Sequence, residues 1–123
     1  MNILVVDDSS TMRRVIANAL KANFDDVNVI EANDGITGLE QFKKHMDDLD
    51  LVLSDWLMPN RNGYELLEDI MAITKKVPVV MLTTEAENDR IMKAIKLGAK
   101  NYITKPFTPQ VLHGIICSVL NIT

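Results

Sequence analysis

The stretch that decides the fold is Leu51-Val52-Leu53-Ser54-Asp55-Trp56-Leu57-Met58-Pro59. It is a short, mostly apolar run that ends at an aspartate, and a segment with tryptophan and proline follows at once. An apolar run of this length, bounded by residues that favour turns, is typical of a buried β-strand. We therefore expect Asp55 at the carboxyl end of a strand, where a sheet opens to solvent. A single aspartate there is most often an ordinary loop residue, so its meaning depends on the other strand ends.

The composition is that of one globular domain. The chain has 123 residues, 47% hydrophobic and 24% charged, which is usual for soluble domains. No apolar run approaches the ~20 residues of a membrane span, and the residues before the first apolar run have no basic region or cleavage site, so we expect no signal peptide. Its single cysteine, Cys117, excludes an internal disulfide. A net charge of -4 argues against nucleic acid as the main partner. We expect a cytoplasmic protein in which residues 1–123 form a single domain with no output domain.

Short strand-like segments recur along the chain. Continuous apolar runs indicate strands buried on both faces, whereas the alternation at residues 27–31 indicates a half-exposed strand at a sheet edge. Proline is tolerated as the first residue of a strand, as at Pro78. The sequence thus predicts five strands, at residues 3–6, 27–31, 51–55, 78–82 and 101–104.

Helical segments follow the strands, and four of the five are opened by a residue that favours a helix N-terminus. The caps are Ser9 or Ser10, Asn33 or Asp34, Thr84 in a capping box with Glu87, and Thr108 before Pro109. The third helix follows a turn at residues 60–63, and the fourth extends to about Leu97, with Gly98 as its stop. The apolar residues at helical spacing, expected to face the core, are Met12, Val15, Ile16, Ala19, Leu20, Ile36, Leu39, Phe42, Met46, Leu66, Leu67, Ile70, Met71, Val111, Leu112, Ile115, Ile116, Val119 and Leu120.

Alternating strands and helices predict an α/β fold in which a doubly wound parallel sheet is covered on both faces. In such sheets ligands bind at the carboxyl ends of the strands. The residues that leave the strands include three carboxylates, a hydroxyl and an ammonium group: Asp7, Asp8, Asp55, Thr83 and Lys105. The sequence therefore predicts that these groups meet at one end of the sheet.

Three neighbouring carboxylates repel one another. At a separation of ~4 Å and an effective dielectric constant of about 20, each pair costs roughly 4 kcal/mol, so a cation or a proton must lie among them. Because all candidate ligands are oxygens, with no His or Cys nearby, we expect Mg²⁺. Lys105 suits a phosphate as a point charge, and an aspartate can act as a covalent nucleophile. The set therefore indicates a site for an acyl phosphate on Asp55.

The order of these residues resembles the receiver domain of two-component response regulators. The resemblance rests on Asp7-Asp8, Asp55, Thr83 and Lys105-Pro106, and it covers the whole chain. Residues 55–60, Tyr102 and residues 105–108 are similar, more narrowly, to the stand-alone chemotaxis regulators. The resemblance implies a (βα)5 flavodoxin-like receiver fold with five parallel strands in the order 2-1-3-4-5.

The same resemblance implies a role for each residue. Asp55 would accept a phosphoryl group from a sensor histidine kinase. Asp8, Asp55 and the backbone carbonyl of Leu57 would bind Mg²⁺, with Asp7 acting through water, and Lys105 would pair with the phosphoryl group. Thr83 would move toward that group and Tyr102 would turn inward, as in other phosphorylation switches. The Lys105-Pro106 peptide would be cis. The chain would be a signalling switch that catalyses only its own phosphorylation and dephosphorylation.

The expected partner surface lies along the fourth helix and the last strand and helix. The fourth helix carries more apolar residues than a core-facing stripe needs. We expect a flagellar motor switch protein to dock there after phosphorylation, and a phosphatase is a further possible partner. We expect a monomer that binds neither nucleic acid nor membrane. The residues assigned to this surface are Ile91, Ile95, Tyr102 and Ile115.

One position departs from the pattern of the chemotaxis regulators. They carry Asn two residues after the phosphorylated aspartate, where this chain has Leu57. The Leu57 side chain cannot hydrogen-bond the phosphoryl group or an attacking water, and we expect it to slow loss of phosphate by crowding the approach of that water. Glu85, two residues after Thr83, matches the family pattern.

Other functional classes fit the sequence less well. A haloacid-dehalogenase-type phosphatase would have a second acid at Leu57, and a P-loop enzyme would need a G-x-x-x-x-G-K-[ST] motif, which is absent. A flavin carrier would not place Asp7 and Asp8 where its phosphate binds, and a DNA-binding regulator would need a second domain. The alternative that stays open is a phosphorelay intermediate or phosphate sink that passes phosphoryl groups to another signalling protein.

Overall fold

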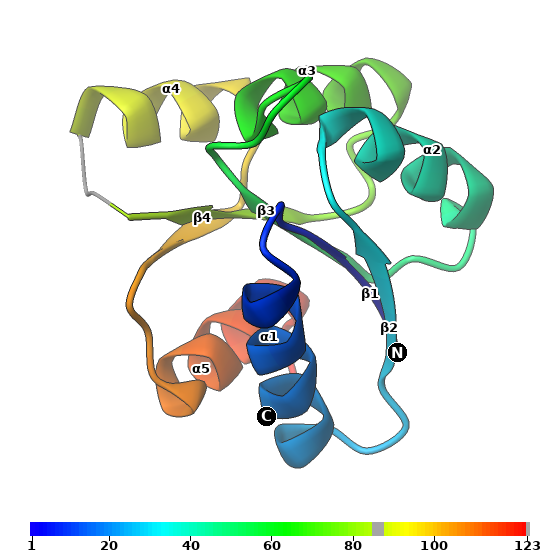
Figure 1. Ribbon diagram of the computed structural model, residues 1–123, viewed down its shortest axis with the longest axis vertical. Helices are drawn as coiled ribbons and strands as arrows, with labels where there is room; N and C mark the ends of the chain where they lie inside the picture. The colour runs from blue at the N-terminus through cyan, green and yellow to red at the C-terminus, as the bar shows by residue number, and fades with distance from the viewer. Residues whose placement is uncertain (85–87, 123) are drawn as a thin grey trace.

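Strands and helices alternate along the whole described chain, which in this computed structural model comprises residues 1–84 and 88–122. Five strands and five helices follow one another without interruption (Figure 1). They are β1 Asn2–Val6, α1 Ser10–Asn23, β2 Asn28–Ala32, α2 Gly35–His45, β3 Leu51–Asp55, α3 Gly63–Ile73, β4 Val79–Thr83, α4 Asn88–Leu97, β5 Asn101–Thr104 and α5 Pro109–Leu120.

The strands form one parallel sheet in the order β2-β1-β3-β4-β5. Helices α2, α3 and α4 cover one face of the sheet, and α1 and α5 cover the other (Figure 1). The predicted fold class, the strand order and the edge position of β2 are therefore confirmed. Every predicted strand lies within one residue of an observed one.

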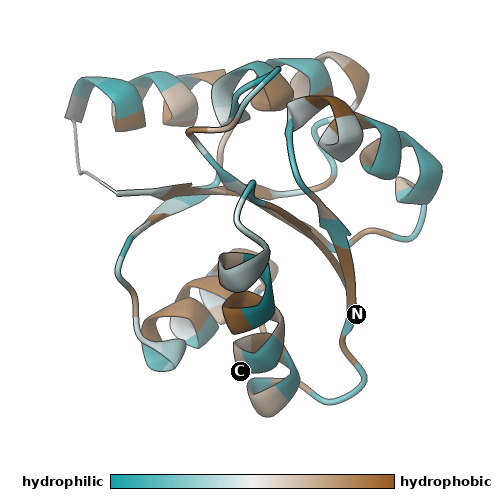
Figure 2. Ribbon diagram, viewed as in Figure 1, coloured by the Kyte–Doolittle hydropathy of each residue, from teal (hydrophilic) through white to brown (hydrophobic). Residues whose placement is uncertain are grey.

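Side chains that alternate along the central strands fill two separate cores. Leu4 and Val52 contribute to the core beneath α2, α3 and α4, and Val5 and Leu53 contribute to the core with α1 and α5. Every residue of β3 is buried, as expected for a central strand covered on both faces. Figure 2 shows largely apolar central strands between helices in which apolar and hydrophilic residues are interspersed. Asp55 is thus carried by a central strand that is buried along its whole length.

Local capping explains where the helices begin. The side chains of Ser9, Asp34 and Thr108 accept hydrogen bonds from backbone N–H groups in the first turns of α1, α2 and α5, which confirms the predicted caps. Gly98 has φ +138° after α4, as its predicted role requires. The predicted capping box of the fourth helix includes Glu87, which lies outside the described residues.

Three residues expected to face the core are instead exposed: Val15, Ile36 and Val111. Val15 lies one position before the buried Ile16, which turns it about 100° away on the helix. Ile36 and Val111 lie in the first turns of α2 and α5. Apolar spacing marks a broad stripe on a helix, but only part of that stripe reaches the sheet. Within the described part of the chain, no helix is long and apolar enough to cross a membrane.

Candidate functional site

Three carboxylates meet at the carboxyl edge of the sheet. Asp7 follows β1 and Asp55 ends β3, and these two strands are paired. Asp7, Asp8 and Asp55 each offer an oxygen, and these oxygens lie within 4.8 Å of one another. Asp7 and Asp55 are buried, whereas Asp8 is exposed. The structure therefore brings the predicted acidic cluster together and leaves one side of it open to solvent.

Lys105 brings the positive charge into this cluster. Its Nζ lies 2.9 Å from Oδ2 of Asp7 and 3.3 Å from Oδ1 of Asp55. The backbone N–H of Lys105 donates to the Thr83 carbonyl at 2.7 Å, which ties the lysine to the end of the neighbouring β4. The Lys105-Pro106 peptide is cis, as the resemblance implied.

The Asp55 carboxylate is held by the backbone that follows it. The Trp56 N–H donates to Asp55 Oδ1 at 2.9 Å, and the Trp56 carbonyl accepts a bond from the Gly63 N–H at 2.8 Å. Gly63 packs so closely on the Asp55 carbonyl that any Cβ there would collide with it. Glycine is thus required at this point of the turn because two backbone segments approach each other.

Burial is the main influence on the ionisation of Asp55. Desolvation raises the pKa of its carboxyl group above the ordinary 3.8, Lys105 acts in the opposite direction, and Asp7 raises the pKa further. Desolvation disfavours the charged form, and so does a neighbouring like charge. Lys105 alone therefore does not offset the unfavourable effect of burial and of Asp7 on the Asp55 anion, and a further positive charge nearby would stabilise that anion.

Asp7 is fixed by contacts that sequence reasoning missed. The Ser9 N–H donates to Asp7 Oδ1 at 2.9 Å, and Nη1 of Arg13 donates to the Asp7 carbonyl at 2.6 Å. Arg13 also pairs with Glu31 at the end of β2, with 3.0 Å between Nε and Oε1. Arg13 lies on the first turn of a helix with no motif around it, so only the folded contact identifies it as a positioning residue.

The loop after Asp55 is held by hydrogen bonds to residues at the junction of β2 and α2. Asn60, with φ +66°, donates from Nδ2 to Asp34 Oδ2 at 2.6 Å, and the Gly35 N–H donates to the Arg61 carbonyl at 2.9 Å. Hydrogen bonds from the Thr37 backbone and from Asn60 lower the pKa of Asp34 below 3.8. These contacts fix the path of the backbone on which Leu57 lies. Its side chain is 60% exposed.

The predicted switch residues occupy different environments. Thr83 is buried at the end of β4, one residue beyond Leu82, which is the register partner of Asp55 on β3, whereas Tyr102 is partly exposed on β5. Glu85, the remaining match to the family pattern, lies outside the described residues.

The residues predicted for the partner surface lie in two places. Tyr102 and Ile115 line one groove of about 420 Å³ between β5 and α5. Ile95 is 40% exposed on α4, and Ile91 is half-buried there.

The sequence pattern of the response regulator receiver domain matches residues 3–117. The chain belongs to this family. The receiver domain is also 45% identical over 123 residues to a chemotaxis protein CheY homolog of Campylobacter jejuni, a match that covers 98% of this chain and 92% of the relative.

Solved receiver structures superpose closely on this one. A response regulator receiver domain protein from Clostridium thermocellum has a TM-score of 0.90 at 33% identity, covering 98% of this chain and 94% of that chain. A chain from the CheX–CheY–BeF3–Mg²⁺ complex of Borrelia burgdorferi has a TM-score of 0.91 at 25% identity, with coverage of 97% and 88%. This receiver domain is therefore a chemotaxis response regulator related to CheY.

The acidic cluster has the chemistry that a magnesium site needs. Receiver domains bind Mg²⁺ in an acidic pocket, and Mg²⁺ is named in the Borrelia burgdorferi CheY complex. Here the clustered donors are carboxylates alone, which are the ligands that this hard cation prefers. The unmet demand for positive charge around Asp55 points in the same direction.

Proposed function

We propose that this receiver domain accepts a phosphoryl group on Asp55 from a sensor histidine kinase in a Mg²⁺-dependent reaction. The observation that supports this most directly is the position of the Asp55 carboxylate, which shares the Lys105 ammonium group with Asp7. Nζ of Lys105 lies 3.3 Å from Oδ1 of Asp55 and 2.9 Å from Oδ2 of Asp7. A nucleophilic oxygen, a cation for the incoming phosphoryl oxygens and an acidic cluster for a metal thus lie together at one edge of the sheet. Asp55 is the only carboxylate of the three that ends the central, fully buried strand.

In this proposal the acidic cluster holds the metal. Asp8, Asp55 and the backbone carbonyl of Leu57 would hold Mg²⁺, and Asp7 would contribute through a water molecule. When bound, the metal supplies positive charge that offsets the charge on the phosphoryl oxygens. The exposed side of the cluster, at Asp8, gives the entry path. Asp7 is too enclosed, and too closely paired with Lys105, to face solvent directly.

The chain's own residues then carry the transfer. An oxygen of Asp55 attacks the phosphorus of a phosphohistidine, the phosphorus–nitrogen bond breaks, and the kinase imidazole leaves with that electron pair. Lys105 turns from its two carboxylates toward a phosphoryl oxygen. Its side chain is 11% exposed and its backbone is fixed on Thr83, so the ammonium moves over a short, defined range.

We infer that phosphorylation is read out by Thr83 and Tyr102. The Thr83 hydroxyl moves toward the phosphoryl group, and Tyr102 turns inward from its partly exposed position on β5. This changes the face formed by Ile91, Ile95, Tyr102 and Ile115, where a flagellar motor switch protein docks. The protein acts in the cytoplasm as a monomeric single-domain switch. It catalyses only its own phosphorylation and dephosphorylation, and a separate phosphatase can accelerate the dephosphorylation.

Phosphorylation by a small phosphodonor tests the proposal. In the presence of Mg²⁺, intact mass measurement should show one phosphoryl group on the natural sequence, and none on Asp55→Asn. Asp50→Asn is the matched control, because Asp50 is an exposed carboxylate just before the same strand. Equal labelling of Asp55→Asn and the natural sequence, or labelling that survives chelation of Mg²⁺, contradicts the proposal.

The docking face has a separate test with a matched pair of variants. Ile95 on α4 and Ile73 on α3 are both 40% exposed, so their substitution by Asp perturbs folding to a similar extent. Ile95→Asp should weaken binding of the phosphorylated protein to a flagellar switch peptide, whereas Ile73→Asp should not. If both variants bind as the natural sequence does, the face is assigned wrongly.

A further inference from the structure

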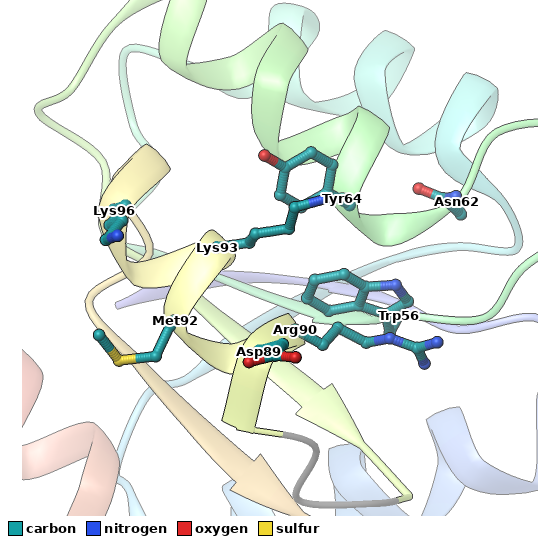
Figure 3. Close-up of a pocket in the computed structure, with 8 residues that line it drawn as sticks. All are labelled: Trp56, Asn62, Tyr64, Asp89, Arg90, Met92, Lys93 and Lys96. Atoms are coloured by element: carbon teal, nitrogen blue, oxygen red, sulfur yellow. The ribbon is translucent and has the colours of Figure 1, made fainter.

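A groove lies between α3 and α4. Its volume is about 670 Å³, within the range of roughly 300–1,000 Å³ usual for binding sites. Trp56 and Tyr64 form its aromatic side, and α4 provides the other wall (Figure 3). The groove shares helix α4 with the surface assigned to the motor switch partner, but none of the four residues of that surface lines it: Ile91, Ile95, Tyr102 and Ile115. The groove is therefore separate from the surface assigned to the motor switch partner.

The α4 wall of the groove is basic although the protein as a whole is acidic. Arg90, Lys93 and Lys96 all line the groove, and Asp89 is the one acid among its described lining residues, in a chain of net charge -4. The three cations recur at every third position and extend over about 9 Å of helix. Lys93 and Lys96 make no ion pair among the residues that the structure describes. This wall therefore presents two uncompensated ammonium groups to whatever enters.

The aromatic side of the groove is already occupied by the protein itself. The Arg90 guanidinium carbon lies 5.4 Å from the centre of the Trp56 ring, and the Tyr64 ring centre is also 5.4 Å from it. Figure 3 shows Tyr64 on one side of the indole and Arg90 on the other. Trp56 is only 9% exposed, so the indole offers no free face on which a nucleotide base could stack.

These observations favour an extended acidic chain over a flat aromatic ligand. Three residues of extended polypeptide span about 10 Å, which matches the length of the basic row. Met92, which is 53% exposed and lines the same groove, provides an adaptable apolar contact for a side chain between the acidic residues. We propose that the α3–α4 groove binds an acidic segment of a partner protein, with Lys93 and Lys96 as its recognition cations. This goes beyond the proposed phosphorylation switch and does not depend on it.

A synthetic peptide tests the groove directly. The probe is a nine-residue peptide of three Glu-Glu-Leu repeats, and its basic counterpart has three Lys-Lys-Leu repeats. Trp56 is the only tryptophan in the chain, so its fluorescence reports binding beside it, and amide chemical shifts locate the contact. The acidic peptide should bind saturably, with shifts at Trp56, Tyr64 and α4, and the basic peptide should not bind.

Charge-reversed variants separate the groove from general electrostatics. The double variant Lys93→Glu/Lys96→Glu should weaken acidic-peptide binding by about tenfold or more. Lys21→Glu/Lys44→Glu, on the exposed ends of α1 and α2, changes the net charge equally and should have little effect. The proposal would be overturned if the acidic peptide did not bind saturably or if the two double variants lost equal affinity for it. Amide chemical-shift changes confined to β5 and α5 would also overturn it. Saturable binding of ATP at the same residues in place of the peptide would also overturn it.

Discussion

Nζ of Lys105 lies 2.9 Å from Oδ2 of Asp7, although 98 positions separate the two residues in the sequence. The same Nζ lies 3.3 Å from Asp55, and the side chains of Asp7 and Asp55 are only 1% and 11% exposed. Two carboxylates in such an enclosed position repel each other strongly, because solvent screens them weakly. Lys105 thus stabilises the resting fold at the place where the phosphoryl group is expected to bind.

Removal of this ammonium group should destabilise the protein. We expect Lys105→Met to lower the free energy of unfolding by about 2 kcal/mol, because it leaves two buried carboxylates without their shared cation. Urea denaturation in the presence of a chelator measures the loss, and added Mg²⁺ should recover part of it. Lys100→Met, at an exposed position before β5, should change stability by less than about 0.5 kcal/mol. A similar loss in both variants would show that the pairing with Asp7 and Asp55 is unimportant.

Neutralising Asp55 should have the opposite effect. Burial raises the pKa of Asp55 above 3.8, so its ionisation opposes folding progressively as the pH rises above 3.8, and in full once the pH exceeds the raised pKa. Without Mg²⁺ at pH 7, Asp55→Asn should therefore be more stable than the natural sequence by about 1 kcal/mol. The difference should shrink as the pH falls through the raised pKa and vanish below 3.8, where Asp55 is protonated in both states.

Urea denaturation at a series of pH values follows this difference. Asp25→Asn, at an exposed turn position, serves as the control and should give a small difference with no matching pH dependence. If Asp55→Asn is less stable than the natural sequence at pH 7 in the presence of a chelator, Lys105 compensates the Asp55 charge more fully than we infer.

Glycine should be essential at position 63 and dispensable at position 114. A Cβ at Gly63 would collide with the Asp55 carbonyl, whereas nothing lies within 4 Å of a Cβ at Gly114, in the interior of α5. We expect Gly63→Ala to cost about 2–4 kcal/mol. Gly114→Ala should stabilise the fold by up to about 1 kcal/mol, since alanine favours helix. Thermal and urea unfolding of the two variants provide the comparison, and equal effects would contradict the role of Gly63 in placing Asp55.

Leu57 should set the lifetime of the phosphorylated state. If its exposed side chain crowds the approach of water to the acyl phosphate, Leu57→Asn should lose phosphate about threefold to tenfold faster, a barrier change of about 0.7–1.4 kcal/mol. Leu57→Ala removes the bulk without adding a hydrogen-bonding group, so it should also accelerate the loss. Decay of the phosphorylated protein after removal of the phosphodonor measures all three rates. Slower loss of phosphate from Leu57→Asn than from the natural sequence would contradict this explanation.

The strand ends were predictable from sequence because apolar runs stop abruptly at polar residues. The positions of Asp7, Asp55 and Lys105 follow from that pattern and from the rule that parallel strands end at one edge. Exposure within the helices was less predictable. The sequence alone does not show that Ile36 and Val111 lie in first turns that the sheet does not cover.

Contacts between separate loops were not predictable at all. The bond from Asn60 to Asp34 joins residues 26 positions apart, and the contact of Gly63 with the Asp55 carbonyl depends on the path of the intervening loop. Neither contact has a local sequence signal, because each arises when two turns meet at the sheet edge. The roles of Asn60, Gly63 and Arg13 could therefore be recognised only in the folded chain.

Tryptophan fluorescence provides the most direct test of the central claim. Trp56 follows Asp55 immediately, and its N–H donates to the carboxylate that is proposed to bind metal and phosphoryl. Titration with Mg²⁺, followed by beryllofluoride as an analogue of the phosphoryl group, should change the fluorescence saturably in two steps. The beryllofluoride step should be absent in Asp55→Asn. No Mg²⁺-dependent response in the natural sequence, or an unchanged beryllofluoride response in Asp55→Asn, would contradict the assignment of Asp55 as the phosphorylated residue.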